Sequence, residues 1–164
     1  MFELRPLSPD AIPASLAKAE RYRLLNDPSQ AESICSDVLA IDPSNQLALT
    51  TLILALTDQF EADNTSAHVA RADAVLPRLT DSYSRAYYAA LIKERRARAY
   101  RAAGRTRLAY EWLLEALHGF DRAIAVRPPG NDDAILRWNA CVRGLEALPK
   151  PSADAEERQA IISE

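Results

Sequence analysis

Two stretches, AERYRLLNDPSQA at residues 19–31 and ARAYRAAGRTRLA at residues 97–109, share one pattern of residues. Each has an alanine, a tyrosine three residues later, an asparagine or glycine four residues further on, and a second alanine after five more. Asparagine and glycine both tolerate the left-handed backbone conformation that commonly ends a helix. Each stretch therefore predicts two helices joined by a very short turn.

The rest of the chain has the same organisation, because apolar residues recur at helical spacing between short runs of turn-forming residues. Asp27 and Pro28 suit the start of a helix, and the stretch from Asp42 to Asn45 again combines residues that end one helix and start the next. Pro77 is expected to fray the end of a helix. We predict seven helices, over about residues 12–25, 27–42, 45–58, 66–79, 81–103, 106–126 and 132–148. Short links make neighbouring helices antiparallel, so three hairpins and one extra helix are expected.

The repeated pattern resembles the tetratricopeptide repeat, whose 34-residue unit is a helix hairpin with small and aromatic residues at fixed places. The matching residues are Ala19, Tyr22, Ala31 and Pro43 in a first unit and Ala97, Tyr100, Gly104 and Ala109 in a third. The units span about residues 12–45, 46–80 and 90–126, and the middle one matches only by apolar spacing. Ser15 and Ala19 replace the family's tryptophan and glycine, and no proline follows the third unit at the usual place.

This resemblance implies an all-α fold, a right-handed superhelical stack of antiparallel helix pairs of the α-solenoid type. We expect one such domain over residues 12–148, an N-terminal extension over 1–11 and a flexible polar tail over 149–164. Trp138 and Val142 in the seventh helix are expected to cover the end of the third unit.

In the family, the first helix of each unit lines a concave groove that binds an extended peptide or a helix of a partner. The resemblance therefore implies a protein-binding adaptor or scaffold whose groove residues are Glu20, Arg23, Thr57, Asp58, Glu94, Arg98 and Arg101. Some members clamp a terminal carboxylate with lysine and asparagine, but Leu16 and Glu20 hold those places in this chain. Recognition of a chain terminus by that clamp is therefore not expected.

The spacing of the histidine, cysteine and acidic residues favours binding over catalysis. His68 and His118 have no partner at metal-ligand spacing, and Cys35 lies on an apolar stripe as a small buried residue would. Asp132 and Asp133 suit a helix start better than acid–base chemistry. We expect no enzyme activity, metal or cofactor. With no apolar leader or membrane-spanning stretch in the sequence, a cytoplasmic location is the default expectation.

Charge is unevenly distributed, although the net charge is only −3. Seven basic residues and one acid, Glu94, lie between Lys93 and Arg107, and Arg98, Arg101 and Arg105 share one helix face. Three interpretations stay open: a solvated or internally paired face, a site for an acidic peptide, and a site for nucleic-acid phosphate. Peptide is favoured over nucleic acid because the rest of the chain is acidic. Self-association through large apolar groups, namely Trp112, Phe120 and Trp138, is a further hypothesis.

Overall fold

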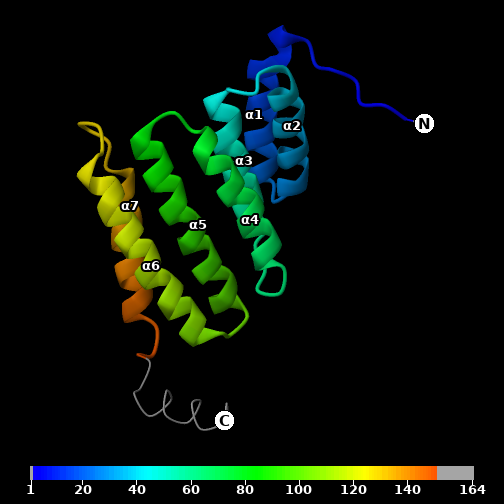
Figure 1. Cartoon of the computed structure of the whole chain (residues 1–164). Helices are drawn as coiled ribbons and strands as arrows, with labels where there is room; N and C mark the ends of the chain where they lie inside the picture. Colours follow the sequence, from blue (N-terminus) through cyan, green and yellow to red (C-terminus); the bar gives the residue numbers. More distant parts are fainter. Residues whose placement is uncertain (1, 151–164) are drawn as a thin grey trace.

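Seven α-helices and two short 3-10 helices make up most of residues 2–150, the part of the chain that the computed structural model describes (Figure 1). The α-helices are α1 (Ile12–Leu24), α2 (Pro28–Ile41), α3 (Gln46–Asp58), α4 (Thr65–Val75), α5 (Ser82–Ala102), α6 (Thr106–Ala125) and α7 (Asp133–Glu146). The 3-10 helices are η1 (Pro9–Ala11), directly before α1, and η2 (Leu76–Arg78), directly after α4. The prediction of an all-α fold with seven helices is confirmed.

The two stretches that share a sequence pattern also share one turn geometry. Asn26, between α1 and α2, has φ of 60°, and Gly104, between α5 and α6, has φ of 71°. In each turn the next amide donates a 2.9 Å hydrogen bond to the tyrosine carbonyl oxygen, Asp27 to Tyr22 and Arg105 to Tyr100. Both turns thus use the left-handed helix ending that the sequence predicts.

Because the two left-handed positions hold different residues, they allow a matched stability test. Gly104→Ala should lower the free energy of unfolding by about 1 kcal/mol, since a Cβ disfavours this conformation. Asn26→Gly should raise it by a few tenths of a kcal/mol to about 1 kcal/mol, since glycine adopts it without strain. Urea unfolding measures both. Opposite signs at the two positions are expected, and equal effects would contradict a shared turn.

The helices pack in sequential antiparallel pairs, and α3 also packs on both α1 and α5 (Figure 1). The order α1, α3, α5 brings three non-consecutive helices side by side, and α7 lies against α6 at the end. We call the surface formed by α1, α3, α5 and α7 the odd-helix face. This face brings together residues that are far apart in the sequence.

Helix ends follow local chemistry in most places. Asp27, Asn45 and Asp81 each accept a hydrogen bond from the backbone amide three residues later and so cap α2, α3 and α5. The fourth helix is shorter than the predicted 66–79: α4 ends at Val75 and continues as η2, which contains Pro77. Proline lacks the amide that an α-helical hydrogen bond requires there, so the chain tightens into a 3-10 turn.

The start of α7 depends on Asn131, which directly precedes the predicted acidic pair. The Asn131 side-chain oxygen accepts hydrogen bonds from the Asp133 amide at 3.0 Å and from the Tyr83 hydroxyl at 3.2 Å. Asp132 makes no capping bond and instead pairs with Arg127 at 3.4 Å. Of the predicted acidic pair, Asp133 therefore lies in the first turn of α7, and Asp132 forms a surface ion pair.

Small residues let the paired helices approach closely. The four alanines of the repeated pattern are buried, namely Ala19, Ala31, Ala97 and Ala109. Where α6 crosses α5, a Cβ built on Gly119 would lie only 2.7 Å from the Ala90 Cβ. Phe120, next to that contact, is buried in the core that α5, α6 and α7 share. The resulting close packing fixes α5 and α6 as one unit.

Helix α7 covers the end of that core, but through partly different residues from those predicted. Ala134 and Cys141 are buried in it and Trp138 packs against it, whereas Val142 is not part of it. At the other end of the chain, residues 2–8 are extended and η1 leads into α1. Residues 151–164 of the predicted tail lie outside the described residues. Within residues 2–150, no helix is long and apolar enough to cross a membrane.

Candidate functional site

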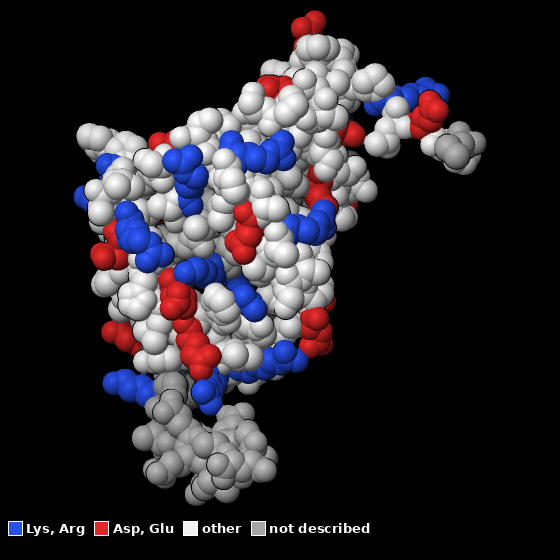
Figure 2. Space-filling model, in the orientation of Figure 1, with Lys and Arg blue, Asp and Glu red and all other residues white. Residues whose placement is uncertain are grey.

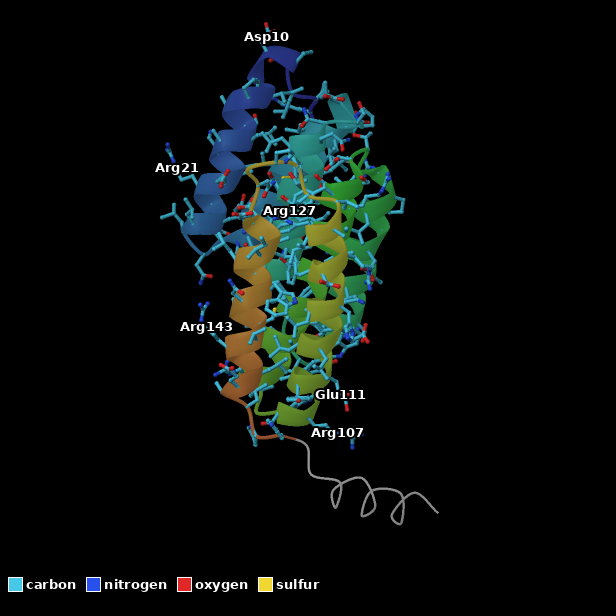
Figure 3. The ribbon with its side chains drawn as sticks, turned by 90° about the vertical axis from the view of Figure 1, so that its left-hand side faces the viewer. Asp10, Arg21, Arg107, Glu111, Arg127 and Arg143 are labelled. Carbon is cyan, nitrogen blue, oxygen red and sulfur yellow. The ribbon has the colours of Figure 1, made fainter. Side chains whose placement is uncertain are left out.

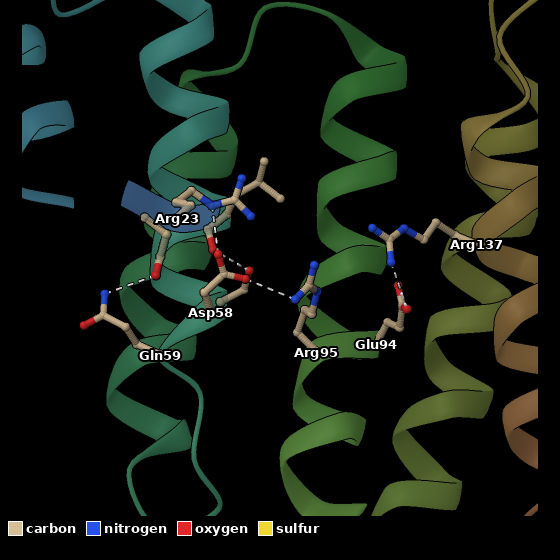
Figure 4. A network of polar contacts seen from close by, with 9 residues as sticks. Arg23, Asp58, Gln59, Glu94, Arg95 and Arg137 are labelled. Atoms are coloured by element: carbon tan, nitrogen blue, oxygen red, sulfur yellow. Dashed lines mark hydrogen bonds and ion pairs between the residues drawn. The ribbon is translucent and has the colours of Figure 1, made fainter. Parts of the chain in front are cut away.

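A row of charged side chains crosses the odd-helix face, and Asp58 is its centre (Figure 4). One Asp58 oxygen, Oδ2, lies 2.8 Å from Arg23 Nε, and the other, Oδ1, lies 3.1 Å from Arg95 Nη1. The side chains of Arg23, Asp58 and Arg95 are 14%, 20% and 12% exposed. One carboxylate thus joins α1, α3 and α5, each of which contributes one residue to the row.

The row places two guanidinium groups on one carboxylate in a setting largely closed to water. Burial lowers the pKa of Arg95, and the like charge of Arg98 lowers it further, while Asp58 acts in the opposite direction. Arg95 Nε is buried and has no hydrogen-bond partner within residues 2–150. The Asp58 carboxylate therefore stabilises the charged form of both guanidinium groups.

A second pair extends the row from α5 to α7. Arg137 Nη1 lies 3.3 Å from Glu94 Oε1 (Figure 4). Burial acts to lower the pKa of Arg137, but the Glu94 carboxylate and the Tyr87 side chain together outweigh it, so the pKa of Arg137 is raised. The other Glu94 oxygen, Oε2, is buried and accepts no hydrogen bond in the described part of the chain.

A small pocket opens beside this second pair, between α5 and α7. Its volume is about 170 Å³. Helix α5 supplies Glu94, Ala97, Arg98 and Arg101, helix α6 supplies Leu113, and helix α7 supplies Ala140, Cys141 and Gly144. We call this the α5–α7 pocket. Its apolar lining consists mostly of small residues, while its charged groups all belong to α5.

Arg98 and Arg101 differ from Lys93, Glu94 and Arg95 of the same helix in their pairing. Lys93, Glu94 and Arg95 each have an oppositely charged partner on another helix. Arg98 and Arg101 are exposed, and neither forms an ion pair with any residue between 2 and 150. The α5–α7 pocket therefore presents two positive charges that no acid among residues 2–150 compensates.

Further basic groups lie on the same side of the molecule. Arg21 of α1 and Arg143 of α7 project to one side in Figure 3. On the face seen in Figure 2, basic and acidic side chains are interspersed, with no broad region of one sign.

The structure brings together most of the residues predicted to line a groove, but in different ways. Glu94, Arg98 and Arg101 line the α5–α7 pocket, and Arg23 and Asp58 bind each other. Thr57 is only 1% exposed and donates a hydrogen bond to the Leu54 carbonyl oxygen, so its side chain does not reach the surface as predicted. The side chain of its neighbour Asp58, which is 20% exposed, lies towards the odd-helix face instead, because successive residues are turned by about 100° around a helix.

Glu20 remains an exposed residue of α1 at the start of the odd-helix face. The periodicity of the sequence did not identify Arg95 and Arg137, which complete the row. Arg95 and Arg137 could have been found only as basic partners for the acidic Asp58 and Glu94. That pairing requires knowing which helices lie side by side, which the sequence does not show.

A second hollow, of about 180 Å³, lies on the other side of α5, where Val69, Asp73, Ile92, Arg96 and Trp112 line it. Here the guanidinium carbon of Arg96 lies 4.0 Å from the centre of the Trp112 ring. This cation–π contact occupies both groups within the protein. The α5–α7 pocket, whose arginines have no such partner, is therefore the better candidate site.

Two large residues proposed for self-association are engaged in the interior. Phe120 is buried in the core, and Trp138 packs against that core. Trp112 is half-buried beneath Arg96. Within residues 2–150, the most exposed large apolar residues are instead Phe2, Leu4, Leu24, Leu25, Leu47, Leu136 and Val126. Of the three residues proposed for self-association, Phe120 is therefore not available for a surface contact.

The titratable residues offer no metal site within the described residues. No group of three or more histidine, cysteine, aspartate or glutamate side chains there is placed to hold an ion. Cys35 and Cys141 are both free and buried, as predicted for Cys35. Burial raises the pKa of the Cys35 thiol to about 11 and that of the Cys141 thiol to about 12.

We therefore expect both thiols to resist alkylation in the folded protein, because the thiolate is the reactive form. At pH 8, iodoacetamide should modify neither cysteine until urea is added, as mass spectrometry would show. The unfolded thiols ionise near pH 9, so their contribution to stability is complete below pH 9 and is lost as pH rises towards 11 and 12. Rapid labelling of folded protein at pH 8 would contradict their burial.

Comparison with known proteins adds no assignment to this geometry. No protein-family model, no curated protein and no solved structure matches the chain.

Proposed function

We propose that this chain is a tetratricopeptide-like stack that binds a peptide or a helix of a partner protein on its odd-helix face. Three features support the proposal: sequential antiparallel helix pairs, the packing of α1 on α3 and of α3 on α5, and the recurring left-handed turn. A stack of this kind presents a continuous surface of first helices to a partner.

The observation on which the proposal rests is the contrast in charge pairing on the odd-helix face. Arg23, Asp58 and Arg95 are tied to one another, and Glu94 is tied to Arg137. Groups engaged in this way hold helices together and are poorly placed to act as catalytic acids or bases. The uncompensated charge of Arg98 and Arg101, beside a pocket, favours binding over catalysis.

The experiment that tests the proposal maps where a natural partner binds. The full chain is used to capture partners from a native extract, and the purified complex is then compared with the free chain by hydroxyl-radical footprinting. Side chains of α1, α3, α5 and α7, including Glu20 and Arg101, should become protected. Side chains of α2, α4 and α6, including Arg122, should keep their reactivity.

Protection confined to α2, α4 and α6 would overturn the proposal, as would a chain that captures no protein. A matched pair of charge reversals adds a second measurement. Glu20→Lys, on the odd-helix face, should weaken capture of a partner that spans the face, whereas Arg122→Glu, on α6, should leave it unchanged. Circular dichroism verifies that both variants are folded.

A further inference from the structure

The α5–α7 pocket combines three properties that together specify a ligand: its size, its two arginines, which form no ion pair among residues 2–150, and its apolar lining. The first property is size. A cavity of about 170 Å³ is close to the roughly 150 Å³ space that holds a benzene molecule inside a protein. Ala97, Ala140 and Gly144 leave this space because their side chains are small, and Leu113 and Cys141 are its larger apolar groups. One apolar side chain fits.

The second property is charge. Arg98 and Arg101 lie three residues apart on α5 and therefore on one face of that helix. The carboxylate nearest to them in the pocket, that of Glu94, is already bound to Arg137. A guanidinium group binds a carboxylate with two parallel hydrogen bonds, so both arginines are suited to acidic side chains.

The third property is the apolar lining. Ala97, Leu113, Ala140 and Cys141 offer contacts to an apolar side chain. A peptide carries such side chains next to its carboxylates, whereas the phosphates of a nucleic acid are joined by polar sugars. The apolar lining therefore favours a peptide over nucleic-acid phosphate as the occupant.

From these properties we infer that the α5–α7 pocket binds a short acidic peptide segment, whose apolar side chain enters the pocket while a neighbouring Asp or Glu side chain pairs with Arg98 and Arg101. This inference rests on the proposed function and narrows it to one kind of partner sequence. The charge pair sets the position of the segment along α5. The pocket sets the size of the side chain next to the acid.

The test selects ligands for the full chain from a random library of displayed dodecapeptides. Enriched peptides should share an apolar residue with Asp or Glu within two positions. For one enriched peptide, fluorescence anisotropy should show at least a tenfold weaker affinity for R98Q/R101Q than for the unchanged protein. Replacing the acid of the peptide by its amide should cause a loss of similar size, because the same interaction is removed.

A second variant separates the pocket from the charges. Ala140 is exposed on α7, so Ala140→Leu partly fills the pocket without entering the core. It should abolish the preference for an apolar residue and leave the salt-sensitive attraction of acidic peptides. Thermal unfolding followed by circular dichroism checks each variant, and R122Q, with one exposed arginine neutralised on α6 and so outside the odd-helix face, is the charge control.

Several results would overturn the inference. They are enrichment of peptides without acids, no enrichment at all, unchanged affinity of folded R98Q/R101Q, and binding of single-stranded DNA as tight as that of the peptide. These results are distinct from failure of the proposed function. If a natural partner protects α1, α3, α5 and α7 but binds R98Q/R101Q normally, the odd-helix face is the binding surface and this ligand assignment is wrong.

Discussion

Replacing Asp58 by alanine should lower the free energy of unfolding by about 3 kcal/mol, the low end of the range for breaking a buried ion pair. Asp58 is the only carboxylate within hydrogen-bond distance of Arg23 and Arg95 in the described part of the chain. Without it, two guanidinium groups remain largely buried and close to one another. For a chain of this size, the midpoint of thermal unfolding should fall by roughly 6–12 °C.

The matched control is Asp63→Ala. The Asp63 carboxylate also binds an arginine, Arg105, at 2.7 Å, but it is 90% exposed. Water screens such a pair, so this change should cost less than about 1 kcal/mol. Chemical denaturation of both variants gives the comparison. Equal losses would mean that burial does not distinguish the two pairs, and the row across the odd-helix face would then be an ordinary surface feature.

A triple replacement tests the cause more directly. If unpaired charge is what destabilises Asp58→Ala, then D58L/R23M/R95M should recover most of the lost stability. Apolar residues of similar volume often match or exceed a buried ion pair in stability. A triple variant that is no more stable than Asp58→Ala would show that the single variant fails for another reason, such as a lost helix ending at α3.

Gly119→Ala should lower the free energy of unfolding by about 2 kcal/mol. The new Cβ would lie 2.7 Å from the Ala90 Cβ and 3.1 Å from the Ala90 Cα, so α5 and α6 must move apart. Overpacking against a helix backbone costs up to about 3 kcal/mol. The better helix propensity of alanine offsets about 1 kcal/mol of this cost. Urea unfolding measures the net effect.

Two further variants show whether the contact itself is responsible. Ala90→Gly removes the opposing methyl group, so A90G/G119A should be more stable than Gly119→Ala alone, with a coupling energy above about 1 kcal/mol. Gly144→Ala is the control, because its Cβ would meet only the end of the Leu113 side chain, at 3.3 Å. That change should stay within about 0.5 kcal/mol of the unchanged protein. If the changes in unfolding free energy of Ala90→Gly and Gly119→Ala simply add in the double variant, the two positions are not in close contact.

The sequence predicts the helices well because their ends depend on local chemistry. Asn26, Gly104 and Asp81 act on the residues next to them, and each lies where the pattern places it. The fourth helix shows the limit of this reasoning: Pro77 marks a disturbance, but the preference for a 3-10 turn over a frayed α-helix depends on packing.

The candidate site is less predictable because it depends on which helices become neighbours. Arg98 and Arg101 stand out in the sequence as part of a basic run, yet Arg95 belongs to the same run and is paired. Only the approach of α3 to α5 separates these roles, since it brings Asp58 to Arg95. The assignment of Thr57 failed for a related reason, because small differences in helix rotation decide which residue faces the surface.

The ion-pair row also limits which helix pairs can be deleted from the chain or placed in another order. A modular array tolerates the loss of an internal unit only if the units on either side match one another. Deleting the α3–α4 unit would remove Asp58 and bring α1 against α5, so Arg23 would meet Arg95 with no acid between them. The ion pairs thus favour one order of the helix pairs. These pairs are similar in form, but they are not interchangeable.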